Sequence, residues 1–127
     1  MRLNAVGRKV LGRHYRGALD ANSLPADDGR EQYIILNTKP APTSGHWVAF
    51  YRPGGARGAL HYYDSYSEPL SRYFPAWRTR AAQADVRDRE QRSRGLGDNV
   101  EDYNCGLLAL TWLVLVKRRG IANAMLV

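Results

Sequence analysis

The middle of the chain alternates short apolar runs with turn signals. Three runs have the length and the aromatic and β-branched composition of β-strands, namely Tyr33–Asn37, Trp47–Tyr51 and Leu60–Asp64. The turn Arg52-Pro-Gly-Gly separates the second run from the third, so we expect these two strands to form an antiparallel hairpin. The pattern therefore predicts a three-stranded meander.

Helical patterns follow these runs. The apolar residues between Pro69 and Trp77 recur at the spacing of one helical face, although Pro75 limits its regularity. The stretch 104–117 is apolar on all sides and is followed by basic residues and a glycine, which is typical of the C-terminal end of a buried helix. Asn104 is a natural N-cap, so we expect Cys105 in the first helical turn. Together the patterns predict an α+β fold with a buried helix packed against a sheet.

Length and composition indicate one soluble domain, which we take to span residues 1–127. The longest apolar stretch, 107–116, is far shorter than the ~20 residues that a membrane-spanning helix needs. The formal charge of +7 is compatible with a nucleic-acid partner, although a solvated basic surface is the commoner explanation of such a charge. The sequence has no zinc-finger spacing and no phosphate-binding glycine loop, so we expect no metal site.

Candidate chemistry begins with the single cysteine, Cys105. A lone cysteine cannot form an internal disulfide, and in a chain that also carries histidines it is a candidate nucleophile. The alternative is a buried packing residue, because unpaired cysteine is among the most buried residue types. A helix N-terminus and a nearby imidazolium would favour the nucleophile, since together they lower a thiol pKa from about 8.5 toward ~4.

Three histidines could serve as the base, and their positions differ. His46 follows a Ser-Gly turn at the start of a predicted strand, where a side chain can face a cleft. His61 lies inside the third strand, and His14 lies among arginines, so structural or solvated roles suit them better. Hairpin pairing would bring Asp64 back beside His46 and allow its carboxylate to orient the imidazole.

Three motifs in order resemble the adenovirus protease (adenain) family and the related ubiquitin-like-protein proteases. They are a His-Trp pair in Gly45–Tyr51, an Asp-Ser pair in Tyr63–Tyr66 and a Cys-Gly pair in Tyr103–Gly106. The stretch Asn37-Thr38-Lys39-Pro40 is similar to an Asn-Thr-Asp-Pro stretch of that family, and the resemblance covers about residues 17–114. It implies a papain-like (adenain-type) cysteine protease fold, with an antiparallel-rich sheet packed on the helix that carries the nucleophile.

The resemblance also implies roles for individual residues. The catalytic triad would be His46, Asp64 and Cys105. The family places a Gln shortly before the Cys to stabilise the oxyanion, and this chain has Asn99 in that region, whose amide can donate together with the backbone N–H of Cys105. Trp47 would shield the imidazole and Gly106 would let the backbone approach substrate, although both residue types also fit simple packing roles.

The implied function is a cysteine endopeptidase that processes viral structural precursor proteins near Gly residues, in the virion and in the nucleus or cytoplasm of the host cell. No cofactor would be required for the chemistry, while DNA or a short peptide would act as an activator. An isopeptidase that deconjugates a ubiquitin-like protein would share every catalytic residue. A basic nucleic-acid-binding domain with a non-catalytic cysteine is the alternative from a different class.

Overall fold

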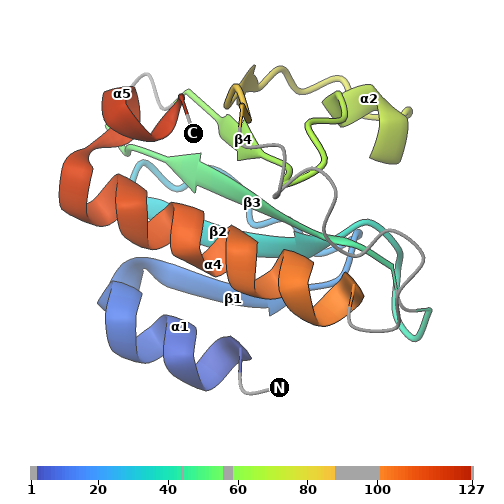
Figure 1. The fold of residues 1–127 in the computed structure, drawn as a ribbon, viewed down its shortest axis with the longest axis horizontal. Coiled ribbons are helices and arrows are strands. Elements are labelled where there is room, and N and C mark those ends of the chain that lie inside the picture. Colours follow the sequence, from blue (N-terminus) through green and yellow to red (C-terminus); the bar gives the residue numbers. More distant parts are fainter. Residues whose placement is uncertain (1–2, 44, 56–58, 88–100, 127) are drawn as a thin grey trace.

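The computed structural model describes residues 3–43, 45–55, 59–87 and 101–126, with only the backbone of 101–104. The protein is an α+β structure in which five strands form one mixed sheet in sequential order (Figure 1). The strands are β1 (Tyr15–Leu19), β2 (Gln32–Asn37), β3 (Trp47–Arg52), β4 (His61–Tyr63) and β5 (Ala82–Gln83). The helices are α1 (Leu3–Leu11), the 3₁₀ helix η1 (Gly12–His14), α2 (Leu70–Tyr73), α4 (Glu101–Arg119) and α5 (Ile121–Ala124). None of the described helices is long and apolar enough to cross a membrane.

The predicted meander is confirmed in the centre of the sheet. β2 and β3 pair antiparallel with Asn37 opposite Trp47, and β3 and β4 pair antiparallel with Ala49 opposite Tyr63. The two outer strands were not predicted, and both pair parallel with their neighbours, β1 with β2 and β5 with β4. The centre of the sheet is therefore antiparallel and its two edges are parallel.

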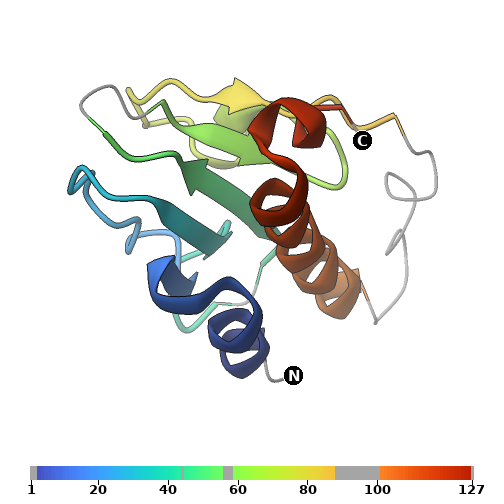
Figure 2. The same ribbon diagram turned by 90° about the vertical axis from the view of Figure 1, so that its left-hand side faces the viewer.

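Both faces of the sheet are covered, which explains why every residue of β2 is buried. Ile35 belongs to the cluster formed with α1 and α4, whereas Ile34 belongs to the cluster formed with the α2 region. Figure 2 shows α1 and α4 on the same face of the sheet. Because alternate residues of a strand point to opposite faces, each central strand contributes to two cores.

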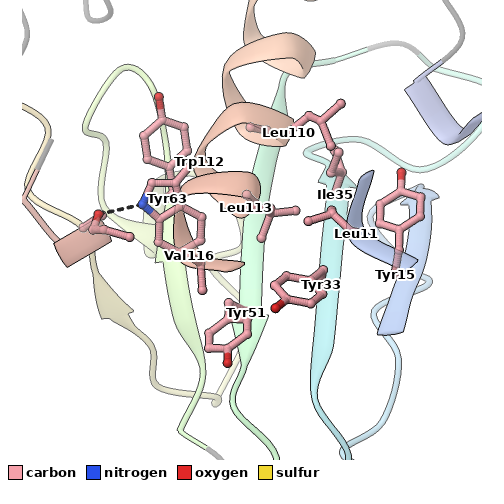
Figure 3. Packing of buried hydrophobic residues seen from close by; sticks show 14 of the residues in the cluster. Leu11, Tyr15, Tyr33, Ile35, Tyr51, Tyr63, Leu110, Trp112, Leu113 and Val116 are labelled. Atoms are coloured by element: carbon pink, nitrogen blue, oxygen red, sulfur yellow. Dashed lines mark hydrogen bonds between the residues drawn. The ribbon is translucent and has the colours of Figure 1, made fainter. Parts of the chain in front are cut away.

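The core beneath α4 is built mainly from tyrosines of the strands and aliphatic residues of the helices, together with Ile35 of β2 and Trp112 of α4 (Figure 3). Leu113 is fully buried there, and Trp112 stacks on Tyr63 of β4 with ring centroids 5.4 Å apart. The Trp112 indole Nε1–H donates a hydrogen bond of 2.7 Å to the carbonyl oxygen of Ala124. This bond satisfies the buried indole and fastens α5 to α4.

The two predicted helices differ from expectation at their boundaries. The helical face expected from Pro69 to Trp77 is a single turn, α2, because Phe74 leaves the helical conformation immediately before Pro75. The predicted N-cap at Asn104 is wrong, since α4 already begins at Glu101. Cys105 consequently lies in the second turn and not in the first. The C-terminal end is as predicted, with Gly120 at a φ of 85° and its N–H bonded to the Val116 carbonyl at 2.8 Å.

Candidate active site

Three chain segments meet at one end of the sheet. His46 immediately precedes β3, and Asp64 immediately follows β4, so the antiparallel register places both residues at the same end. The first turns of α4, which carry Cys105, lie beside the start of β3 (Figure 1). Because both sheet residues lie just beyond the paired strands, a helix on one face can reach them around the end of the sheet.

The imidazole of His46 is hydrogen-bonded to the carboxylate of Asp64, with Nε2 and Oδ1 2.5 Å apart. The backbone of His46 is held separately by Thr38, whose hydroxyl oxygen accepts the His46 N–H at 3.0 Å. In return the Thr38 N–H donates to the His46 carbonyl oxygen at 2.8 Å. The expected pairing of His46 with Asp64 is therefore present, on a backbone fixed from both sides.

Asp64 is completely buried, and the chain that follows it wraps around its carboxylate. Oδ1 also accepts the Tyr66 backbone N–H at 3.2 Å, while Oδ2 accepts the Glu68 backbone N–H at 2.9 Å and the Tyr73 hydroxyl at 2.9 Å. An ionised carboxylate only accepts hydrogen bonds, so these donors suit the charged form. The donors compensate for the loss of water around a buried negative charge.

Cys105 is 1% exposed, and its sulfur receives a hydrogen bond of 3.2 Å from the backbone N–H of Trp47. This hydrogen bond holds the sulfur beside the start of β3. The second ring nitrogen of His46, Nδ1, is buried and has no partner of regular hydrogen-bond geometry among the described residues. The Cys105 side chain nevertheless interacts with the imidazole, so the sulfur lies near the ring without the alignment of a regular hydrogen bond.

The charge state of His46 follows from its surroundings. Burial by itself lowers the pKa of His46, but the hydrogen bond to Asp64 and the interaction with the Cys105 side chain, and then the negative charge of both groups, raise it to about 9. The imidazole is therefore protonated at neutral pH. An imidazolium between a carboxylate and a sulfur can stabilise a thiolate and later donate its proton to a leaving group.

Two tyrosines enclose the imidazole, and the sequence analysis assigned neither of them a role. The Tyr66 ring stacks on His46 with centroids 4.5 Å apart and 6° between the planes. The Tyr73 ring lies at 5.4 Å with a tilt of 45°. The position of Tyr66 two residues after the predicted Asp64 was the available signal, whereas Tyr73 looked like one apolar position of a helical face.

Trp47 and Gly106 contact each other. A Cβ atom built on Gly106 would lie 3.2 Å from Trp47 Cδ1 and 3.4 Å from Leu3 Cδ2. The Trp47 ring therefore points toward α4, and the ring stacked on the imidazole belongs to Tyr66. Gly106 allows α4 to approach β3 closely enough for the Trp47 N–H to reach the sulfur of Cys105.

The predicted oxyanion donors are not assembled among the described residues. Asn99 lies outside the part of the chain that the structure describes. The backbone N–H of Cys105 lies in the second turn of α4, where amides bond the carbonyl four residues earlier in the helix. The earlier helix start thus removes this N–H as the free donor that an N-cap at Asn104 would have provided.

The other histidines lie elsewhere. His61 stands in β4 opposite Tyr51, and burial lowers its pKa. His14 belongs to η1, just before β1, at the opposite end of the sheet from His46. Within residues 3–43, 45–55, 59–87 and 105–126, no group of three His, Cys, Asp or Glu side chains could hold a metal ion.

A groove of about 340 Å³ opens beside Trp47. Its walls come from the ends of β1 and β2 and from the loop before β3, and include Leu19, Asn37, Lys39, Pro42 and Thr43. The same tryptophan contributes its backbone N–H to the Cys105 sulfur, whereas His46, Asp64 and Cys105 themselves are not among the residues that line the groove.

Comparison of the chain with known protein families and with curated proteins gives no match.

Proposed function

We propose that the protein is a cysteine peptidase of papain-like, adenain type, with Cys105 as nucleophile, His46 as acid and base, and Asp64 as the residue that orients His46. One observation carries the proposal. The imidazole of His46 is bonded to a fully buried, multiply hydrogen-bonded carboxylate and at the same time interacts with the Cys105 side chain. A cysteine that served only for packing would not need a buried ion pair beside it.

The chemistry follows from these groups. The Cys105 thiolate attacks the peptide carbonyl carbon, and a C–S bond forms while the imidazolium of His46 donates its proton to the leaving amine as the C–N bond breaks. The neutral imidazole then takes a proton from water, which attacks the thioester and releases the carboxylic acid and the thiolate. Asp64 holds the imidazole in one orientation and stabilises its charged form through both steps.

The substrate class that we propose is a viral structural precursor cleaved near Gly residues. This part rests on the three sequence motifs and their order, with His46, Asp64 and Cys105 at the matching positions. The groove beside Trp47 offers a path for an extended polypeptide. Deconjugation of a ubiquitin-like protein requires the same triad, so the substrate test below includes it as a separate outcome.

The first experiment measures the rate of Cys105 alkylation by iodoacetamide against pH, with mass spectrometry as the readout. A small reagent is chosen because the cysteine is 1% exposed. The wild-type protein should react rapidly at about pH 6, well below the ordinary thiol pKa of about 8.5, because the imidazolium stabilises the thiolate. In His46→Gln the low-pH reactivity should disappear. The proposal would be contradicted if the alkylation rate of the wild-type protein depended on pH in the same way as that of a free thiol.

The second experiment measures turnover of a library of Gly-containing peptides and of a ubiquitin-like fusion that ends in Gly-Gly. Cys105→Ser and His46→Ala should each abolish cleavage while far-UV circular dichroism stays close to wild type. The melting temperature should be kept in Cys105→Ser and should fall in His46→Ala, because the buried Asp64 carboxylate loses its partner. Cleavage of the fusion alone would identify a deconjugase. If Cys105 is alkylated rapidly at low pH but no substrate is cleaved, the same site would carry out another thiol-dependent reaction.

A further inference from the structure

The end of the sheet opposite the candidate triad carries a hollow of about 640 Å³ whose lining is mainly cationic. Parallel pairing of β1 with β2 brings the chain before Tyr15 next to the chain before Tyr33 at this end. The first segment is η1 and the second is the loop that enters β2. The lining residues are Arg13, His14, Arg16, Asp28 and Arg30.

Asp28 fixes the direction of the innermost arginine. Its Oδ2 accepts a hydrogen bond of 2.9 Å from Nη2 of Arg16, and its Oδ1 accepts the Arg30 backbone N–H at 3.0 Å. The amide of Gln32, a fully buried residue, also donates to Asp28 Oδ1 at 3.3 Å. The backbone N–H of Arg30, followed by Arg16, lowers the pKa of Asp28, so this carboxylate is charged and acts as an anchor for Arg16.

The hollow keeps an excess of positive charge after this pairing. Three arginines and one carboxylate line the hollow, and Arg13 and Arg30 are exposed. Nε of Arg16 is buried and has no hydrogen-bond partner within the described part of the chain. A guanidinium that is held by Asp28 and lines the same hollow as two further arginines is suited to accept an anion.

We propose that this hollow binds a phosphoryl group. Planar guanidinium forks match the oxygen geometry of phosphate and bind it through paired N–H···O bonds. Arg16 would provide the pre-oriented contact, and Arg13 and Arg30 would close on the anion from η1 and from the loop before β2. The site is separate from the triad, because Gln32 and Asn37 mark opposite ends of β2.

Two sources carry this chemistry, namely a free di- or triphosphate and the phosphodiester backbone of a nucleic acid. Isothermal titration of the full chain with inorganic pyrophosphate, with adenosine triphosphate and with a short single-stranded oligonucleotide distinguishes them. Tighter binding of pyrophosphate than of the oligonucleotide, compared per phosphate, would assign the site to free phosphates. The reverse order, with a steep dependence on salt, would assign it to a nucleic-acid backbone.

The variants Arg13→Gln and Arg30→Gln remove one exposed cation each and should weaken binding by roughly tenfold, because a charge-assisted hydrogen bond is lost. Arg78→Gln removes the same charge from an exposed position outside the hollow and is the matched control. It should change the affinity less than twofold. The proposal is overturned if none of the three probes binds, or if Arg78→Gln weakens binding as much as Arg30→Gln, which would indicate diffuse attraction.

Discussion

The imidazole of His46 lies parallel to the ring of Tyr66, with the ring centroids 4.5 Å apart. Tyr66 belongs to the same short segment, 64–68, whose backbone N–H groups bind the Asp64 carboxylate. A protonated imidazole is attracted to the face of an aromatic ring, and this contact adds to the charge pairing with Asp64. Segment 64–68 therefore provides the negative charge of Asp64 and also covers the imidazolium of His46 with the ring of Tyr66.

The Asp64→Asn variant should lower the pKa of His46 and impair the reaction. The substituted amide would present N–H groups where Glu68 N–H and the Tyr73 hydroxyl already donate, so one side of the pocket would have donors facing donors. We expect peptidase activity to fall by at least about 10²-fold, because the imidazole loses its orienting charge. NMR titration of the His46 ring would measure the pKa, and an unchanged value near 9 would contradict this account.

Stability should depend on pH through His46. Its folded-state pKa of about 9 lies above the ordinary value of 6.5, so the proton binds more tightly to the folded chain than to the unfolded chain. The resulting stabilisation is fully present below about pH 6.5 and is lost as the pH rises through about 9. This stabilisation is on the order of 3 kcal/mol.

Urea unfolding at about pH 6 and about pH 9.5 measures this effect when His46→Gln is compared with the wild type. The wild-type free energy of unfolding should fall more steeply between the two pH values than that of the variant. Parallel pH profiles of the two proteins would show that His46 does not carry the dependence.

Tyr73 should position Asp64 through its hydroxyl group. Tyr73→Phe removes the hydrogen bond of 2.9 Å to Oδ2 and should cost about 1–2 kcal/mol of stability, since the acceptor is buried and charged. It should also shift the pH profile of Cys105 alkylation, because the carboxylate that fixes His46 becomes less constrained. Tyr51→Phe is the matched control, because its hydroxyl bonds Glu31 at 2.6 Å near the other end of the sheet. If Tyr51→Phe shifted the pH profile of Cys105 alkylation as much as Tyr73→Phe, the role of Tyr73 would be a general structural one.

Gly106→Val should disturb the site through Trp47. Even a single Cβ at this position would lie 3.2 Å from the Trp47 ring, and the branched side chain of valine would force α4 and the start of β3 apart. The Trp47 N–H would then move away from the Cys105 sulfur, and we expect slower alkylation at low pH together with a loss of about 1–3 kcal/mol in stability. Leu107→Val is a suitable control, because it introduces the same side chain on the exposed face of α4. Gly12→Ala is not suitable, because Gly12 has a φ of 78° and any side chain there would be strained.

Much of the site could be anticipated from local patterns. The turn sequence after Arg52 predicts the hairpin, and the antiparallel register of β3 and β4 carries Asp64 back to the level of His46. The apolar composition of the last long segment predicted a buried helix, and the helix does carry Cys105 into the core. These features depend on neighbours in the chain, so the sequence pattern contains them.

Other elements have no local signal. β1, with the sequence Tyr-Arg-Gly-Ala-Leu, lacks apolar alternation and contains Gly17 at a φ of 115°. It is a strand because β2 pairs with it and α1 packs on it. The start of α4 also lacks a clear local signal. The N-cap propensity of Asn104 predicts a start at this residue, but the tertiary environment outweighs that preference and the helix begins at Glu101.

The sequence by itself determined the central meander, the buried helix and the order of His, Asp and Cys along the chain, because each follows from short-range periodicity and turn chemistry. The tertiary structure decided the environment of the three groups. Trp47 and Cys105 are 58 positions apart, and the hydrogen bond between them exists only because α4 packs on β3. The donors around Asp64 likewise converge from a loop and a helical turn, so the charge of His46 is a property of the folded protein that no local pattern encodes.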